Sequence, residues 1–370
     1  MILWLFAASL AFLAYFFVGY PVLLLILGRL RPKPVRRESI TPPVSVIIPV
    51  RNGEKWIEAK LRSVFALRYP RERLHVIVIS DGSTDHTVNL ARAFPGVEVL
   101  ELPSGGKGKA LNAGIAAATG EILFFTDIRQ PLATDCLANL VSNFADASIG
   151  VASGELVMVD AEGHEQKSLG LYTRYEEWLR KQISKVSSVA GATGAVYTMR
   201  RSLAVLLPED ILLDDVYQPL ATYFQGYRVI LDGTAVAYDY PVKIEAEFRR
   251  KVRTLAGLYQ VIRYYPRLFH PGYDIWLHWL SHKFSRLVLP YAFLTLAITS
   301  FWLPDPWRWW VIAAQSLFYG SAAVDAILPR QFPLKRLTSL CRTFVTMLAA
   351  SLLAIRILFV PARSLWKEQR

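Results

Sequence analysis

Cysteine is scarce in this chain of 370 residues, which contains only Cys136 and Cys341. The two lie far apart in the sequence and form no Cys-x-x-Cys pair, which argues against a disulfide framework and a thiolate metal site. The six histidines show no metal-ligand spacing, so zinc is not expected. Internal repeats and low-complexity tracts are also missing.

Charged residues are also few, at 19%, whereas hydrophobic residues make up 53% of the chain. A mean hydropathy of +0.29 is too high for a purely soluble protein. The net charge of +12 would suit nucleic acid, anionic lipid or an acidic substrate. Many basic residues, however, stand beside apolar runs and not on one face of a soluble domain. This placement favours a membrane surface and argues against nucleic acid.

The first apolar run, Ile2–Gly28, is too long for a signal peptide and lacks a basic n-region. It is long enough to cross a hydrocarbon core about 30 Å thick. We therefore predict a transmembrane helix within residues 1–30. The basic linker that follows, residues 31–42, is expected on the cytoplasmic side because arginine and lysine favour that side.

Three later apolar runs predict a C-terminal transmembrane region over residues 285–362, followed by a tail at 363–370. The runs are Leu287–Leu303, Trp309–Leu328 and Leu337–Val360. Arg342 and Arg356 in the last run must find partners or reach the interface, because charge in hydrocarbon is costly. If that run spans, the basic tail lies outside, against the positive-inside rule. A re-entrant or interfacial last helix is the alternative.

Short apolar runs alternate with helical patterns over residues 43–245, which predicts a doubly wound, mostly parallel mixed α/β sheet. Val44–Pro49 is rich in β-branched residues and indicates a buried strand, and Glu54–Leu67 has the spacing of an amphipathic helix. Further strands are expected at His75–Ser80, Val97–Leu100 and Ile122–Phe125, and further helices from Ser83 or Thr84 to about Ala93 and over Ala110–Thr119. Residues 246–284 then form a basic amphipathic segment, which suits either the membrane interface or a solvated helix packed on the domain.

Polar motifs follow four of these strands, at Asn52, Asp81, Lys107 and Asp127. Ligands of open α/β sheets bind beyond the carboxyl ends of the strands, so these residues are expected to gather at one edge. Asp81 suits a hydrogen-bond acceptor for a base or ribose, and the glycine-rich Ser104–Lys109 suits an anion. Taken singly, the Asp81 motif is also an ordinary turn and Ser104–Lys109 an ordinary solvated loop.

Asp127 is the candidate ligand for a divalent cation, because hard cations prefer carboxylate oxygens. The residue two positions on is Arg129, so a second acid is missing there. Either Asp127 works with Asp81 or the phosphates of a ligand, or Arg129 supplies part of the charge.

Asp214 and Asp215 precede a helix predicted to reach Phe224. An acid at a helix start is an ordinary cap, worth about 1 kcal/mol. Asp215 could equally be a general base, and the two roles are compatible, since the neighbouring charge would raise one of the two pKa values. The small residues Gly191, Thr193 and Gly194 either let an acceptor approach or form a turn into a strand.

Together these motifs make the chain similar to glycosyltransferase family 2, in particular to its membrane-integrated members such as cellulose and hyaluronan synthases. The resemblance implies a GT-A domain. The stretch Ser80–Ser83 corresponds to the part that binds the uracil-ribose end of a UDP-sugar, and Lys107–Asn112 to the pattern Lys-x-x-Ala-Leu-Asn. Thr126–Arg129 stands at the Asp-x-Asp metal position, and Leu213–Asp215 at the Thr-Glu-Asp motif, whose last acid is the base.

The resemblance also assigns site residues. Asp215, Asp214 and Arg253 are expected in catalysis and Gly191, Thr193 and Gly194 at the acceptor. Nucleotide-sugar contacts are expected from Pro49, Arg51, Asn52, Glu54, Asp81, Ser83, Lys107, Asn112, Asp127, Arg129 and Arg250. The family motif Gln-x-x-Arg-Trp appears here as residues 250–254, Arg-Lys-Val-Arg-Thr, which puts processive polymer synthesis in doubt.

The predicted activity is inverting transfer of a hexose or N-acetylhexosamine from a UDP-sugar to a hydroxyl of a polysaccharide or lipid, in cell-envelope or exopolysaccharide synthesis. Mg²⁺ or Mn²⁺ on Asp127 is expected. The predicted location is the bacterial inner (plasma) membrane, with the catalytic domain cytoplasmic. The alternative is a catalytically inactive membrane protein that binds a nucleotide-sugar or a partner. The sequence identifies no protein partner.

Overall fold

The computed structural model describes residues 1–159, 171–240, 244–329, 331–362 and 364. The predicted tail at 363–370 therefore lies outside the described residues, apart from Ser364. The chain divides into two compact units. The sheet unit consists of Arg31–Ser168 and Arg180–Pro241, and the helical unit consists of Met1–Leu30, Leu169–Leu179 and Val242–Arg370.

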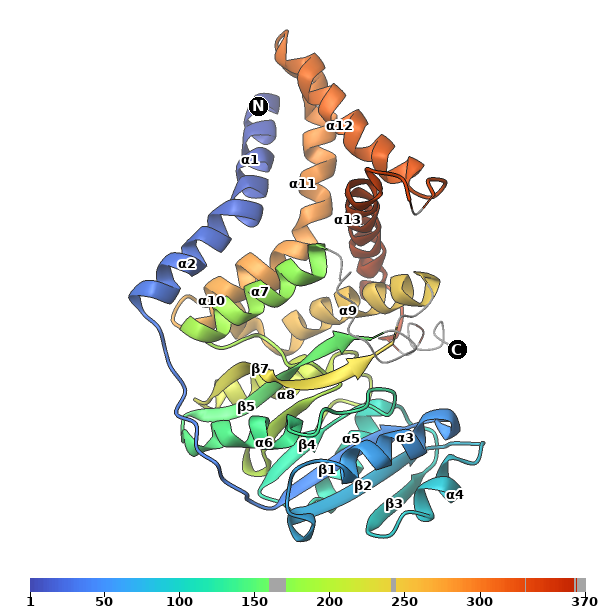
Figure 1. Cartoon of the computed structure of the whole chain (residues 1–370). Coiled ribbons are helices and arrows are strands. Elements are labelled where there is room, and N and C mark those ends of the chain that lie inside the picture. The colour runs from blue at the N-terminus through green and yellow to red at the C-terminus, as the bar shows by residue number, and fades with distance from the viewer. Residues whose placement is uncertain (160–170, 241–243, 330, 363, 365–370) are drawn as a thin grey trace. The chain divides into compact units, whose positions relative to one another are not determined.

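The sheet unit is built on a 7-stranded sheet with the order β3-β2-β1-β4-β6-β5-β7 (Figure 1). Only β6 runs antiparallel to its two neighbours, so the sheet is mixed and mostly parallel, as predicted. The strands are β1 (Val44–Val50), β2 (Leu74–Asp81), β3 (Val97–Leu102), β4 (Ile122–Phe125), β5 (Ile149–Met158), β6 (Tyr197–Arg200) and β7 (Arg228–Asp239).

Helices cover both faces of this sheet. They are α3 (Glu54–Phe65), α4 (Thr87–Arg92), α5 (Lys107–Ala117), α6 (Cys136–Ser142) and α8 (Asp214–Phe224). Val46 and Ile48 of β1 belong to the core cluster that contains Leu61 of α3, whereas Ile47 faces Gly114 of α5. Burial on both faces explains why β1 is an almost continuous apolar run.

Several predicted boundaries need correction. Helix α4 begins at Thr87 and not at Ser83 or Thr84, because the loop before it is bonded to the first strand's loop as described below. Helix α5 begins at Lys107, three residues before the expected start. Helix α7 (Leu171–Val186) and strands β5 and β7 were not predicted.

The helical unit contains α1 (Ile2–Ala14), α2 (Tyr20–Leu30), α9 (Ile244–Tyr264), α10 (Ile275–His278), α11 (Ser285–Thr299), α12 (Trp307–Val324) and α13 (Lys335–Ala354). Within the described residues, three helices are long and apolar enough to cross a membrane: Ile2–Leu30, Ile275–Trp302 and Lys335–Leu358. Helix α12, which corresponds to the predicted run Trp309–Leu328, is not among them. Large apolar side chains such as Trp4, Leu10 and Ile298 are exposed in this unit, as expected where lipid covers a helix.

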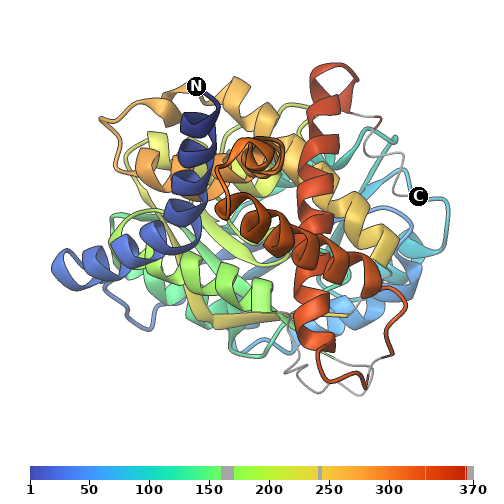
Figure 2. The ribbon, with the colours of Figure 1, turned by 90° about the horizontal axis from the view of Figure 1, so that it is seen from above.

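Two of these long helices bend at π-helical segments, Tyr15–Gly19 and Trp279–Phe284. The bends are joined by hydrogen bonds between the Tyr15 hydroxyl and Ser281 Oγ (2.6 Å) and between the Tyr20 hydroxyl and His278 Nδ1 (3.0 Å). Figure 2 shows the resulting change of direction between α1 and α2. Because π-bulges interrupt the helical hydrogen-bond ladder, they account for both bends.

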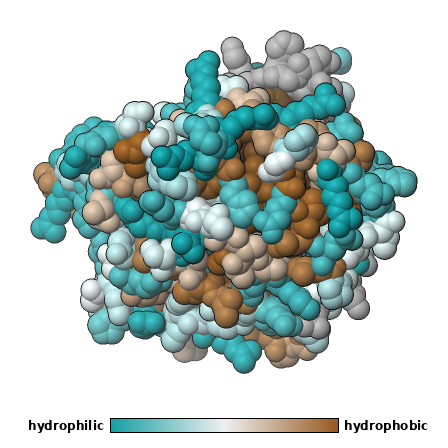
Figure 3. Space-filling view, turned by 90° about the horizontal axis from the view of Figure 1, so that it is seen from below, coloured by the Kyte–Doolittle hydropathy of each residue, from teal (hydrophilic) through white to brown (hydrophobic). Residues whose placement is uncertain are grey.

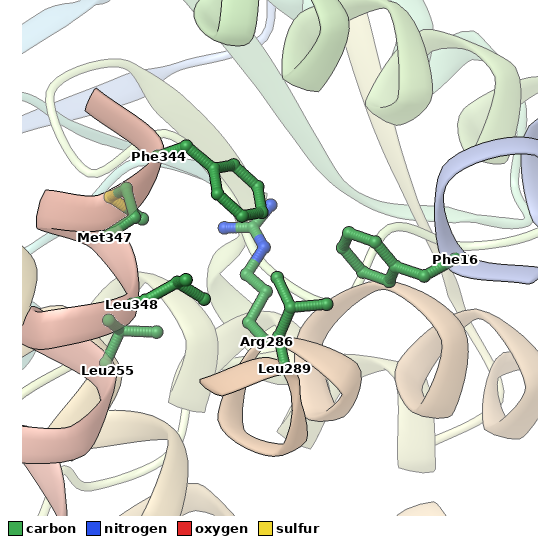
Figure 4. Close-up of a pocket in the computed structure, with 7 residues that line it drawn as sticks. All are labelled: Phe16, Leu255, Arg286, Leu289, Phe344, Met347 and Leu348. Carbon is green, nitrogen blue, oxygen red and sulfur yellow. The ribbon is translucent and has the colours of Figure 1, made fainter. Parts of the chain in front are cut away.

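Several charged groups in the described part of the helical unit are paired. Arg342 of α13, which needed a partner, has its Nη1 3.5 Å from a carboxylate oxygen of Asp325. Arg286 of α11 is bonded to Glu176 and to His282, and its side chain lies in a pocket that is otherwise apolar (Figure 4). The pocket is lined by Phe16, Leu255, Arg286, Leu289, Phe344, Met347 and Leu348.

Seen from below, hydrophilic and hydrophobic side chains intermingle on the surface of the molecule (Figure 3), as is usual for a face in contact with water.

Candidate active site

The parallel strands β1, β2 and β4 bring their carboxyl ends to one edge of the sheet. Val50 of β1 lies opposite Ser80 of β2, so the segments after these strands start side by side. The structure brings Asn52, Asp81, Lys107 and Asp127 to this edge, as the sequence predicted, through the contacts given below. The gathering follows from strand direction alone, since ligands of such sheets lie beyond the carboxyl ends.

Asp81 holds the glycine-rich loop before α5. Its Oδ1 accepts hydrogen bonds from the backbone N–H groups of Gly105 (2.6 Å) and Gly106 (3.0 Å), and its side chain is buried. Gly82, next to it, has a φ of 65°, and a Cβ there would come within 2.8 Å of the Ser104 nitrogen. The carboxylate predicted to accept from a nucleoside therefore already accepts from this loop.

Asn52, Ser83 and Glu54 tie together the loops that follow β1 and β2. The Asn52 N–H donates to Ser83 Oγ (3.1 Å), and the Asn52 side-chain oxygen accepts from the Thr84 N–H (2.8 Å). Glu54 accepts from the His86 N–H at 3.1 Å. These bonds explain why Ser83 and Thr84 do not cap α4. All three predicted residues lie at the edge, where they shape its backbone.

Lys107, the first residue of α5, stands between two acids from different elements. Its Nζ lies 3.1 Å from Asp127 Oδ1 and 3.2 Å from Asp214 Oδ1. Burial opposes its charge, but the carboxylates of Asp127, Asp214 and Asp215 outweigh burial and raise the pKa of Lys107 above its ordinary value. The lysine therefore stays charged and holds Asp127 close to the acidic start of α8.

Asp215 lies against the small-residue turn that leads to β6. The Asp215 carbonyl accepts a hydrogen bond from the Ala192 N–H at 2.7 Å. A Cβ on Gly194 would come within 3.0 Å of Asp215 Oδ2, so a larger residue there would press on the carboxylate. Thr193 is fixed through its N–H, which donates to Ser153 Oγ (2.8 Å), and its hydroxyl, which accepts from Arg180 (3.1 Å).

Arg129, which replaces a second acid, is held by an acid that the sequence analysis missed. Arg129 Nη2 donates to Asp239 Oδ1 at 2.7 Å, and the Asp239 side chain is buried at the end of β7. Asp239 belongs to no motif and lies 110 positions away from Arg129 in the sequence, so only the pairing of β7 into the sheet reveals it.

Lys60 is a second missed residue. It lies on the buried face of α3, where its exposed fraction is 1%, and its Nζ donates to Thr126 Oγ1 and to the Gln130 carbonyl, both at 2.5 Å. Burial lowers the pKa of Lys60 to about 7, and nearby Asp127 opposes part of this shift. The available signal was its spacing from Ile57 and Val64, which places a lysine among apolar residues of the helix.

The remaining predicted residues lie partly at the edge and partly away from it. Arg51 donates to Ser104 Oγ of the glycine-rich loop at 2.5 Å, and Pro49 lies within β1. Asn112 on α5 is engaged at both ends of its amide by the backbone of Leu207, at 2.9 and 2.8 Å. Arg250 and Arg253 lie on α9, in the helical unit.

The model of the family described as glycosyl transferase family 2 matches residues 45–204, which contain most of this edge. The uncharacterized glycosyltransferase RT0329 of Rickettsia typhi is 31% identical over 241 residues, which cover 62% of this chain and 71% of that protein. The chain belongs to glycosyltransferase family 2.

A solved structure of similar length supports the same assignment. The mannosyltransferase PcManGT from Pyrobaculum calidifontis, in complex with GDP-Man and Mn²⁺, superposes with a TM-score of 0.72 at 26% identity. The match covers 96% of this chain and 99% of PcManGT, and it identifies the mostly parallel sheet as a GT-A fold. The probable glycosyltransferase YdaM of Bacillus subtilis is 26% identical over 247 residues, but the match spans only 58% of its length.

The residues of this family 2 site suit a divalent cation that is held mainly by the substrate. No group of three or more His, Cys, Asp or Glu residues that could hold a metal occurs within the described part of the chain. The Asp127 side chain, the predicted oxygen ligand, is 36% exposed at the edge. Mg²⁺ and similar ions are commonly held by one or two carboxylates together with substrate phosphates. The residues present therefore suit a metal that arrives with, and is largely coordinated by, a diphosphate.

Proposed function

We propose that this family 2 glycosyltransferase moves a hexose or N-acetylhexosamine from a nucleoside-diphosphate sugar to a hydroxyl group, with inversion. The observation that carries the proposal is the contact of Lys107 with Asp127 and Asp214 at the edge of the sheet. This contact connects Asp127, the candidate carboxylate for the sugar donor, with the start of α8, which bears the candidate base Asp215. The resemblance favours a UDP-sugar, and the GDP-Man bound to PcManGT makes a GDP-sugar the second donor to test.

In the proposed reaction, Asp215 is the general base. The oxygen of the acceptor hydroxyl attacks the anomeric carbon while its proton passes to the Asp215 carboxylate. The bond between that carbon and the diphosphate oxygen breaks, and the diphosphate leaves with the electron pair. Because attack and departure occur on opposite faces of the sugar, the configuration inverts.

The other residues of the edge stabilise charge. Lys107 and Arg129 supply fixed positive charge near the leaving diphosphate, and Asp214 and Asp239 hold these two cations in place. Asp127 would hold Mg²⁺ or Mn²⁺, which when bound neutralises part of the diphosphate charge. Arg253 is assigned to the diphosphate by the family resemblance alone.

We place the reaction at a membrane. Three candidate spans support membrane association, and the basic residues that follow the first one favour a cytoplasmic catalytic domain. A bacterial inner membrane is the proposed location. The acceptor is a lipid or a polysaccharide, since either can present a hydroxyl at the interface.

Release of nucleoside diphosphate by the purified, detergent-solubilised protein tests this proposal. UDP- and GDP-sugars are supplied with candidate lipid and saccharide acceptors, in Mg²⁺, Mn²⁺ or EDTA. We expect one donor to be turned over, activity to fall with EDTA, and Asp215→Asn to lower turnover at least 100-fold while nucleotide binding persists. Nucleotide binding without turnover of any donor would favour the non-catalytic alternative.

A further inference from the structure

Lys60 is a buried lysine without an obvious structural need. Ile57, Leu61 and Val64, on the same face of α3, are fully buried apolar residues, and an apolar side chain at position 60 would complete that face. Burying an ammonium group is costly unless it is hydrogen-bonded or paired. The interactions that offset this cost therefore indicate what the lysine does.

Those interactions lie at the two ends of one short segment. Lys60 Nζ donates to Thr126 Oγ1 and to the Gln130 carbonyl, each at 2.5 Å. Between these two points the chain carries Asp127 and Arg129, which face Lys107 and Asp239 at the edge. The Lys60 ammonium group thus fixes both ends of the loop that carries Asp127 and Arg129.

The same contact continues to the other side of the site. Thr126 Oγ1 accepts from Lys60 and donates its own proton to the Ala195 carbonyl at 2.8 Å. Ala195 follows Gly194, which lies against the Asp215 carboxylate. Lys60, Thr126 and Ala195 therefore form a buried chain of hydrogen bonds that connects the Asp127 loop to the turn that packs on Asp215.

We propose that Lys60 is a positioning residue that keeps the Asp127 loop and the Gly191–Ala195 turn fixed relative to one another. It does not touch substrate, since it is buried behind the loop. The inference rests on the proposed function, because the loop carries Asp127, the proposed metal ligand, and the turn packs on Asp215, the proposed base. Small displacements of such groups are expensive in rate, since about 1 Å of misplacement can cost on the order of 100-fold.

Four variants separate positioning from simple stability. Lys60→Met keeps the length of the side chain and removes the donor. Thr126→Val removes the hydroxyl with little change of shape, and Thr126→Ser retains it. Asn143→Leu is the matched control, because Asn143 is equally buried and hydrogen-bonded, but to Asn139, Leu140 and Asp232.

The first readout is turnover by folded protein. We expect Lys60→Met and Thr126→Val each to lower kcat at least tenfold and to raise the Mn²⁺ concentration needed for half-maximal rate. The kcat of the double variant should be little lower than that of either single variant, because both substitutions break the same chain of hydrogen bonds. Thr126→Ser should stay within threefold of the parent, and Asn143→Leu should lower Tm without changing kcat. Unchanged kcat and metal dependence in folded Lys60→Met would overturn the inference.

The second readout does not need turnover, so it distinguishes failure of this inference from failure of the proposed function. Hydrogen exchange is measured on peptides that cover residues 126–130 and 191–196. Faster exchange in both segments of Lys60→Met, but not of Asn143→Leu, supports their fixed relative position even if no donor is turned over. Exchange that accelerates in neither segment, or only in α3, contradicts it.

Discussion

Lys107 illustrates how one residue can hold an acidic site together. Its ammonium group contacts Asp127 and Asp214, which belong to segments almost 90 positions apart in the sequence. Two carboxylates this close would repel one another without a cation between them. The sequence suggested Lys107 as a phosphate-binding lysine, whereas the structure adds a role within the protein itself.

Replacing Lys107 by methionine is expected to impair both stability and activity. The change leaves the buried Asp214 without its cation, which should cost on the order of 2–4 kcal/mol of unfolding free energy and lower Tm. Turnover should fall at least 100-fold, because the donor-side charge is lost as well. Thermal unfolding and nucleoside diphosphate release measure the two effects. The double variant Lys107→Met/Asp214→Asn is the control: it should recover much of the Tm but not the turnover, and no recovery of Tm would contradict the pairing.

Lys60 gives the stability of the sheet unit a pH dependence of known sign. Burial lowers its pKa from 10.5 to about 7 in the folded protein, whereas the unfolded chain retains the ordinary value. Between these two values the unfolded state binds more protons, so the unfolding free energy should rise as pH increases from 7 toward 10.5. Lys60→Met should lack this contribution. Thermal unfolding of both proteins at pH 7 and pH 9 tests this, and an equal change of Tm in the two would contradict it.

Among the elements, the first half of the sheet was predictable and the second half was not. Strands β1, β2 and β4 are short apolar runs followed by motifs, and the range of β4 was predicted without error. Strand β5 (Ile149–Met158) contains glycines at positions 150 and 154 together with Ser153 and Glu155, so it shows no apolar run. Its pairing with β7 also includes register shifts, which sequence periodicity does not reveal.

The same division explains which site residues were predictable. Asp81, Lys107 and Asp127 follow predictable strands, and Asp215 lies in the first turn of a predictable helix. Asp239 ends β7, whose position was unknown, so its ion pair with Arg129 was unknown too. Lys60 was missed because a charged residue on a helix is normally expected to face water.

The π-helical bends of the helical unit should be sensitive to loss of their connecting hydrogen bonds. Tyr20 is almost fully buried and its hydroxyl bonds to His278, which is also buried. Tyr20→Phe removes this buried hydrogen bond and should cost about 1–2 kcal/mol. We expect a lower Tm in detergent, with a smaller loss for Tyr15→Phe, because Tyr15 is more exposed than Tyr20. Equal Tm values for Tyr20→Phe and the parent would show that this bond does not hold the bend.

For the molecule as a whole, the candidate spans predict which parts of the chain face which side of the membrane. With the sheet unit cytoplasmic, the connection at Asp305 should face outward. In a Cys136→Ser/Cys341→Ser background, Asp305→Cys should react with a membrane-impermeant maleimide in intact cells, whereas Glu209→Cys in the sheet unit should react only after lysis. The reverse pattern would contradict the cytoplasmic placement. In the parent protein, which retains Cys136, this residue should label poorly, because burial raises its pKa to about 12.

The division of the chain into units does not follow the order of the sequence. The sheet unit is interrupted by Leu169–Leu179, so α7 begins in the helical unit and ends in the sheet unit. Glu176, in the first part of α7, bonds to His282 and Arg286 of the later helices. A fragment of residues 31–241 would therefore keep Glu176 but lose both of its bonding partners, His282 and Arg286. A fragment limited to the sheet unit therefore requires removal of Leu169–Leu179 and rejoining of the chain, and not only trimming of its ends.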